Sequence, residues 1–148
     1  MFDALDIPFY YYLIAIGLGI VIGLWKKEWR IGVLVGYIFF ILTETVLVRK
    51  PGALRYELIP LWSWNSPEHF YQIMANIILF IPIGFLLGKN GWKGLLIAAG
   101  LSMAIELIQL ITHRGLFEFD DIIHNTLGAV IGFGIWSLAG KAKRNDFW

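Results

Sequence analysis

The chain has 148 residues, of which 58% are hydrophobic and only 16% are charged, and its formal net charge is +1. A soluble domain is usually about 45–50% apolar and about 25% charged, so this composition excludes a soluble globular domain and predicts an integral membrane protein. The chain contains no cysteine, which excludes disulfides, zinc–thiolate sites and cysteine nucleophiles.

Five hydrophobic runs, separated by charged connections, take up almost the whole chain. A bilayer core about 30 Å thick is crossed by roughly 17–25 apolar residues of helix. We therefore expect an all-α fold, a bundle of about five transmembrane helices that forms one domain over residues 1–148. The first run follows Asp3 and Asp6 rather than Lys or Arg, the reverse of a secretory signal, so we expect it to be retained. The expected spans are residues 8–25, 31–48, 72–88, 94–112 and 122–140.

The Lys and Arg residues predict the orientation of these spans. Eight of them lie on the side that holds residues 26–30, residues 89–93 and the C-terminal tail, and four lie on the other side. Because cytoplasmic loops carry the excess of positive charge, we expect the N-terminus outside, the C-terminus inside, and a multi-pass location in a bacterial cytoplasmic membrane. The basic tail beside a span is no nucleic-acid patch, so the expected partners are membrane lipids and not nucleic acid.

The connection between the second and third spans, residues 49–71, is the only long one. It combines Pro51, Pro60 and Pro67 with several aromatic residues. Such a composition suits the headgroup layer, and it also suits a shallow re-entrant turn packed against protein. The sequence leaves both alternatives open.

Glycines four residues apart recur along the spans. In lipid, faces of this kind let two helices approach closely, so they predict tight packing of the bundle and also allow a homodimer. The pairs are Gly19 and Gly23, Gly32 and Gly36, Gly84 and Gly88, and Gly128 and Gly132.

Polar side chains occur in four of the expected spans at a similar depth. An ionisable group inside a membrane costs at least about 2.5 kcal/mol on insertion scales, so it normally faces the bundle interior. At 1.5 Å per residue, five polar side chains from these spans fall within about 10 Å of the expected outer boundary. They are Glu44, Asn76, Glu106, Gln109 and Asn125.

Four charged residues, Arg49, Arg114, Asp120 and Asp121, follow just above that level. They allow two interpretations. The arginines could neutralise the buried carboxylates in a structural ion-pair network, because an unpaired buried charge is costly. Alternatively, the groups could form a polar cavity open to the outer leaflet, in which arginine would bind a phosphate or a carboxylate through two parallel hydrogen bonds.

Short motifs in a fixed order identify a resemblance to the VanZ-like family over about residues 40–136. Glu44 and Arg49 close the second span, and Leu-Ile-Pro follows at 58–60. The remaining motifs are N-I-I-L-F-I-P-I-G-F at 76–85, S-M-A-I-E-L-I-Q at 102–109, Arg114, and F-D-D-I-I-H-N-T-L-G-A-V-I-G at 119–132.

The resemblance implies a membrane protein of the bacterial envelope. The member that names the family lowers susceptibility to the lipoglycopeptide teicoplanin without remodelling the D-Ala-D-Ala precursor. We therefore expect a non-enzymatic protein, with no metal or cofactor, whose polar pocket binds a lipid-linked cell-wall precursor, a lipid headgroup or the antibiotic. The residues expected to form this pocket are Glu44, Arg49, Asn76, Glu106, Gln109, Arg114, Asp121 and Asn125.

Two alternatives stay open. A membrane-embedded enzyme acting on a lipid-linked envelope substrate would use Glu106, Asp120 and Asp121 as acids or bases and His124 as a proton carrier, because general acid–base catalysis needs such groups beside the reacting atom. Without that role, we expect His124 to begin the last span and face the headgroups. The other alternative is a transporter or a structural membrane subunit, although the five spans show no inverted repeat.

Overall fold

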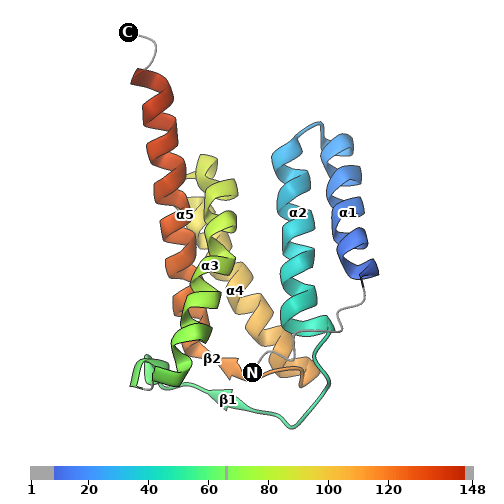
Figure 1. The fold of residues 1–148 in the computed structure, drawn as a ribbon, viewed down its shortest axis with the longest axis vertical. Coiled ribbons are helices and arrows are strands. Elements are labelled where there is room, and N and C mark those ends of the chain that lie inside the picture. Colours follow the sequence, from blue (N-terminus) through green and yellow to red (C-terminus); the bar gives the residue numbers. More distant parts are fainter. Residues whose placement is uncertain (1–8, 66, 146–148) are drawn as a thin grey trace.

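The computed structural model describes residues 9–65 and 67–145, with side chains described up to residue 140, and it is almost entirely helical. Figure 1 shows two groups of helices that run in roughly the same direction. One is a hairpin of two helices, and the other is a bundle of three. The helices are α1 (Tyr10–Lys26), α2 (Trp29–Leu42), α3 (Phe70–Leu87), α4 (Trp92–Thr112) and α5 (Phe119–Asn145).

Four helical stretches of the described chain are long and apolar enough to cross a membrane. The helix α2 reaches this length because it continues into a π-helical turn, Thr43–Leu47. The helix α1 is also apolar but has only 17 residues, just below the length of the others. An all-α helical bundle is therefore supported, and its described part holds four helices that could cross a membrane by length and composition and one shorter apolar helix. The four are Trp29–Leu47, Pro67–Asn90, Trp92–Thr112 and Phe119–Gly140.

Glycines bring α1 and α2 into direct backbone contact. Lys27 adopts a positive φ of 53° and ends α1, so that α2 can return alongside it. A methyl group on Gly19 would lie 2.9 Å from the carbonyl oxygen of Gly32, and one on Gly36 would lie 2.7 Å from that of Ala15. The glycine pairs expected in these two helices therefore pack against each other within one chain.

The tightest packing in the bundle joins α3 to α5. A methyl group on Gly84 would overlap the backbone of Ala129, and one on Gly132 would overlap the backbone of Ile81. These glycines also pack against a neighbouring helix of the same chain. The glycine pairs therefore pack helices of one chain together, and the expectation of a homodimer stays a prediction.

The hydrophobic core lies where α2 meets the three-helix bundle. Ile41, Phe80 and Ile83 are completely buried there, beside Ile105 and Ala129. Between membrane helices such side chains stabilise the contact through close van der Waals packing, because lipid tails are as apolar as the side chains themselves. One hydrogen bond reinforces this contact, since the Tyr37 hydroxyl donates to the carbonyl oxygen of Leu79 at 2.9 Å.

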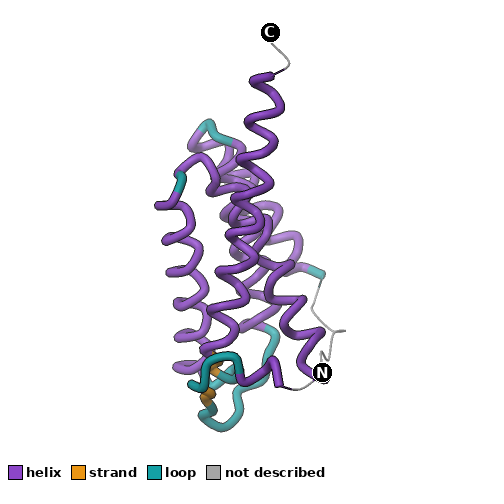
Figure 2. Tube along the Cα trace, turned by 90° about the vertical axis from the view of Figure 1, so that its left-hand side faces the viewer, coloured by secondary structure: helices purple, strands orange, loops and turns teal. Residues whose placement is uncertain are grey.

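The long connection crosses one end of the bundle and pairs with the link between α4 and α5 (Figures 1 and 2). Its strand β1 (Tyr56–Glu57) lies parallel to β2 (Phe117–Glu118), with Tyr56 opposite Phe117. The amide of Gly52 also donates to the carbonyl oxygen of His113 at 2.7 Å. The connection is thus an ordered cover over the end where α3 and α5 begin, and β2 leads directly into α5.

Candidate functional site

Three buried or partly buried carboxylates meet beneath this cover. Glu106 projects from α4 and is only 2% exposed, Glu118 lies on β2 and is 5% exposed, and Asp121 follows in the first turn of α5. The backbone N–H of Glu118 donates to Oε2 of Glu106 at 3.0 Å. The pairing of β2 with β1 therefore fixes the position of Glu118, and Glu118 in turn orients Glu106.

Two amide side chains of α3 hold the other carboxylates. Gln72 donates through Nε2 to Oε2 of Glu118 at 2.6 Å, and it approaches Oδ1 of Asp121 at 3.5 Å. Asn76 donates through Nδ2 to the same Oδ1 atom at 2.6 Å. Gln72 and Asn76 are one helical turn apart, so both face α5. Hydrogen bonds to a carboxylate stabilise its charged form inside the protein.

A second layer of polar groups lies one helical turn deeper. Asn125 donates through Nδ2 to Oγ of Ser102 at 2.9 Å, and both side chains are buried. Oδ1 of Asn125 is buried and accepts no hydrogen bond. Gln109 is buried on the same face of α4 as Ser102 and Glu106. We call these eight residues the polar cluster: Gln72, Asn76, Ser102, Glu106, Gln109, Glu118, Asp121 and Asn125.

Burial raises the pKa of Glu118, which lies outside the membrane-spanning helices. Removal from water penalises the charged carboxylate, and the hydrogen bond from Gln72 acts in the opposite direction without outweighing it. The neighbouring carboxylate Asp120 adds a smaller electrostatic contribution that also raises this pKa. The cluster is therefore rich in hydrogen-bond acceptors and poor in compensating positive charge.

The two arginines predicted for the site have different surroundings. Arg49 acts electrostatically on Glu106, Glu118 and Asp121, although its own side chain is exposed. Arg114 instead donates through Nη1 to the carbonyl oxygens of Leu47 and Arg49, at 2.9 Å and 3.0 Å. It therefore holds the end of the π-helical turn. Both of these hydrogen bonds are with backbone carbonyls, and the expected pairing of Arg114 with an anionic ligand stays a prediction.

The hydrogen bond of Glu44 is with a residue outside the polar cluster. Its Oε1 accepts a hydrogen bond from the hydroxyl of Tyr12 at 3.0 Å, which ties α1 to the π-helical turn. The structure therefore joins Asn76, Glu106 and Asp121 by direct or shared contacts. Asn125 lies one helical turn beyond Asp121 and bonds to Ser102, whereas Glu44 joins the two helices of the hairpin.

A further set of polar contacts anchors the cover to α5. Asp120 is buried and accepts hydrogen bonds from the N–H of Leu61, from the N–H of Ser63 at 3.0 Å and from Oγ of Ser63 at 2.5 Å. Nε2 of His124 accepts a hydrogen bond from Nε1 of Trp64 at 2.7 Å. The expectation that His124 faces the headgroups is wrong, because Trp64 covers it and its exposed fraction is 1%.

The acid–base candidates of the enzyme alternative are consequently divided. Glu106 and Asp121 belong to the polar cluster, while Asp120 and His124 hold the cover. Among the residues that the structure describes, no group of three or more His, Cys, Asp or Glu side chains is placed to hold a metal ion.

Three members of the cluster were missed by sequence reasoning. Gln72 and Ser102 each lie four residues before a predicted member, Asn76 and Glu106, and this spacing is a signal that could have identified them. Glu118 lies outside the expected spans. A charged residue outside a span carries no cost of insertion into lipid, so its position did not mark it as a site residue. Only the pairing of β2 with β1 places Glu118 in the protein interior.

The comparisons with known proteins agree on one family. A family model described as VanZ/LLP1 matches residues 29–140. The chain is also 35% identical, over 86 residues, to Protein VanZ of Enterococcus faecium, an alignment that covers 55% of this chain and 53% of that protein. The chain thus spans about half the length of this curated relative. No solved structure matches the chain.

Proposed function

Because the chain belongs to the VanZ/LLP1 family, we propose that it contributes to resistance against glycopeptide or lipoglycopeptide antibiotics of the teicoplanin type. It does so as a binding protein of the bacterial cytoplasmic membrane. Its ligand is a lipid-linked cell-wall precursor, a lipid headgroup or the antibiotic itself. The observation that carries this proposal is the polar cluster, in which three helices and β2 bring carboxylate and amide groups to one end of a membrane bundle.

The chemistry of the cluster favours a ligand group that donates hydrogen bonds. Glu106, Glu118 and Asp121 offer acceptor oxygens, and Arg49 is the cation that acts on all three. An ammonium, an amide N–H or a sugar hydroxyl of the ligand would satisfy these oxygens. The engagement of Arg114 with backbone carbonyls supports this preference.

The proposal is tested by replacing Glu106→Gln and Asp121→Asn, singly, in a teicoplanin-susceptible bacterial host. Each change replaces an acceptor oxygen by an amide N–H, and a buried donor of the ligand left unpaired costs about 1–3 kcal/mol. Each change is therefore expected to weaken ligand binding roughly tenfold and to reduce resistance. Teicoplanin susceptibility is measured in cells that contain equal amounts of each protein, and thermal unfolding of the purified proteins identifies any loss of folding.

The matched control is Glu28→Gln, which removes a carboxylate at the opposite end of the molecule, where Glu28 pairs with Lys89. This variant should retain full resistance. Wild-type resistance in folded Glu106→Gln and Asp121→Asn proteins would rule out the polar cluster as the binding site.

A further inference from the structure

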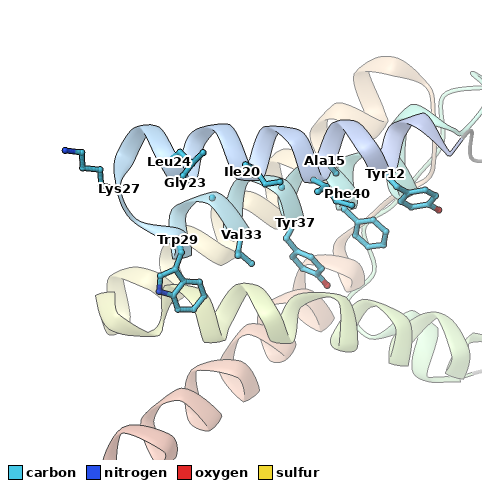
Figure 3. A pocket seen from close by; sticks show the side chains of 14 residues that line it. Tyr12, Ala15, Ile20, Gly23, Leu24, Lys27, Trp29, Val33, Tyr37 and Phe40 are labelled. Atoms are coloured by element: carbon cyan, nitrogen blue, oxygen red, sulfur yellow. The ribbon is translucent and has the colours of Figure 1, made fainter.

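An apolar groove runs along the hairpin of α1 and α2, away from the polar cluster. It has a volume of about 920 Å³, and Figure 3 shows the side chains that line it. Gly19 and Gly32 form its floor, because the two helices touch there and leave no side chain to fill the space. Ile20, Leu24 and Val33 stand at its edges and are themselves largely exposed.

Positive charge gathers at one end of this groove. Lys27 and Trp29 line that end. Lys26 lies over the ring of Trp25, 4.1 Å from its centroid, and Arg30 lies over the ring of Trp29 at 5.6 Å. Tyr12 lines the other end. The groove therefore combines a long apolar channel with a cationic, aromatic mouth at the end that is predicted to be cytoplasmic.

A second hollow opens beside the same mouth. It has a volume of about 290 Å³ and lies between the start of α2 and the end of α3. Arg30 and Lys89 line it together with Leu34 and Leu86. Two apolar hollows thus flank the beginning of α2. Glu28 pairs with Lys89 there, so Lys27 and Arg30 are the lining cations left to meet an anion.

The length and the charge of the groove indicate its occupant. From Tyr12 to Lys27 the helix rises about 22 Å, at 1.5 Å per residue, which is longer than half of a bilayer core about 30 Å thick. An acyl chain fills such a channel, and a phosphate meets the cations at its mouth. A second copy of this chain in the same membrane would bring its own basic residues to the same level, where like charges repel.

We propose that the groove binds an anionic diacyl phospholipid. Its phosphate lies against Lys27 and near Arg30, whose guanidinium lies over the ring of the groove-lining Trp29. One of its acyl chains lies along the groove, over the contact of α1 with α2. The basic mouth of the groove lies at the opposite end of the molecule from the polar cluster, none of whose residues lines the groove. This lipid site does not depend on the function proposed for that cluster. The bound lipid covers apolar side chains that the protein itself leaves open.

The test is native mass spectrometry of the full chain in detergent, titrated with dioleoylphosphatidylglycerol or with dioleoylphosphatidylcholine. The wild-type protein should bind the anionic lipid at least tenfold more tightly, because each basic residue near a lipid phosphate adds about 1 kcal/mol and two together account for such a ratio. The double variant Lys27→Ala, Arg30→Ala should lose this preference.

The matched control is Lys50→Ala, Arg55→Ala, which removes two exposed cations from the opposite end and should bind as the wild type does. In a second variant, Ile20→Trp, the larger side chain should fill the groove and reduce binding of both lipids while the basic mouth remains. Equal affinity for the two lipids, or an unchanged preference in the Lys27 and Arg30 variant, would overturn the proposal. So would a dimer in detergent that Ile20→Trp converts to a monomer, because the groove would then bind a second copy.

Discussion

Gln72 and Asn76 hold the side chains of Glu118 and Asp121 close to each other, although both of these are carboxylates. The sequence predicted Asn76, Glu106, Asp121 and Asn125 from their depth in the expected spans. It could not predict which donor meets which acceptor, because those contacts depend on the rotation of α3 against α5.

Glu118 provides a prediction at the scale of one residue. Its pKa is raised from the usual 4.5 by burial, so the folded protein keeps this proton to a higher pH than the unfolded chain does. Between these two pKa values the native state binds more protons, and stability must fall as the pH rises through that window. Glu118→Gln should therefore unfold at a higher temperature than the wild type above the window, and at a similar temperature near pH 4.

Thermal unfolding of the purified protein, measured from pH 4 to pH 8, checks this expectation. Glu57→Gln is the control, because Glu57 lies on the paired strand and is less buried. An unchanged pH profile in Glu118→Gln would show that the burial of this carboxylate does not control stability.

Hydropathy located the helices well, but it located their ends less well. The structure begins α4 at Trp92 and α5 at Phe119, two and three residues before the expected spans. Backbone hydrogen bonding continues into polar and aromatic residues at the membrane surface, where water or side chains can satisfy the remaining groups. The π-helical turn after Leu42 was not predictable, because no residue pattern distinguishes it from the α-helix that it extends.

The contact of α3 with α5 gives a prediction at the scale of the element. In Gly132→Ala the added methyl group would overlap the backbone of Ile81, which cannot move away as a side chain could. Overpacking of this kind costs about 1–3 kcal/mol, so the variant should unfold at a clearly lower temperature or denaturant concentration. Gly134→Ala is the control. Gly134 lies on the same helix, and nothing lies within 4 Å of the methyl group that this change adds. Equal losses in both variants would assign the effect to the helix itself.

The whole molecule consists of a hairpin that touches a three-helix bundle, and the sequence predicted the number of elements better than their arrangement. The pairing of residues 56–57 with residues 117–118 joins segments that are far apart in the chain. Short, distant strand pairs leave no periodic signal, so the ordered cover could only be expected as one of two alternatives. The same limit applies to Arg114, whose two partners are backbone carbonyl groups.

Arg114 gives the prediction at this scale, because it joins the end of α4 to the end of the hairpin. Arg114→Leu should loosen this junction and leave the contact of α3 with α5 intact. We expect hydrogen exchange of the Gly52 amide, which donates to His113, to become roughly tenfold faster, as loss of about 1.4 kcal/mol implies. Arg55→Leu, which changes an exposed arginine in the same connection, should exchange as the wild type does. Slower or unchanged exchange in Arg114→Leu would contradict this role.

The parallel pairing of β1 with β2 also constrains how the protein is assembled in the cell. The ribosome completes β1 before it has made α3 and α4, and β2 emerges only after both. Until then, the segment around β1 has no partner strand, and the donors that will hold Glu118 and Asp121 have nothing to bind. Insertion of the last helix is thus the event that closes the site, and a nascent chain arrested before it would present an open, protease-sensitive connection.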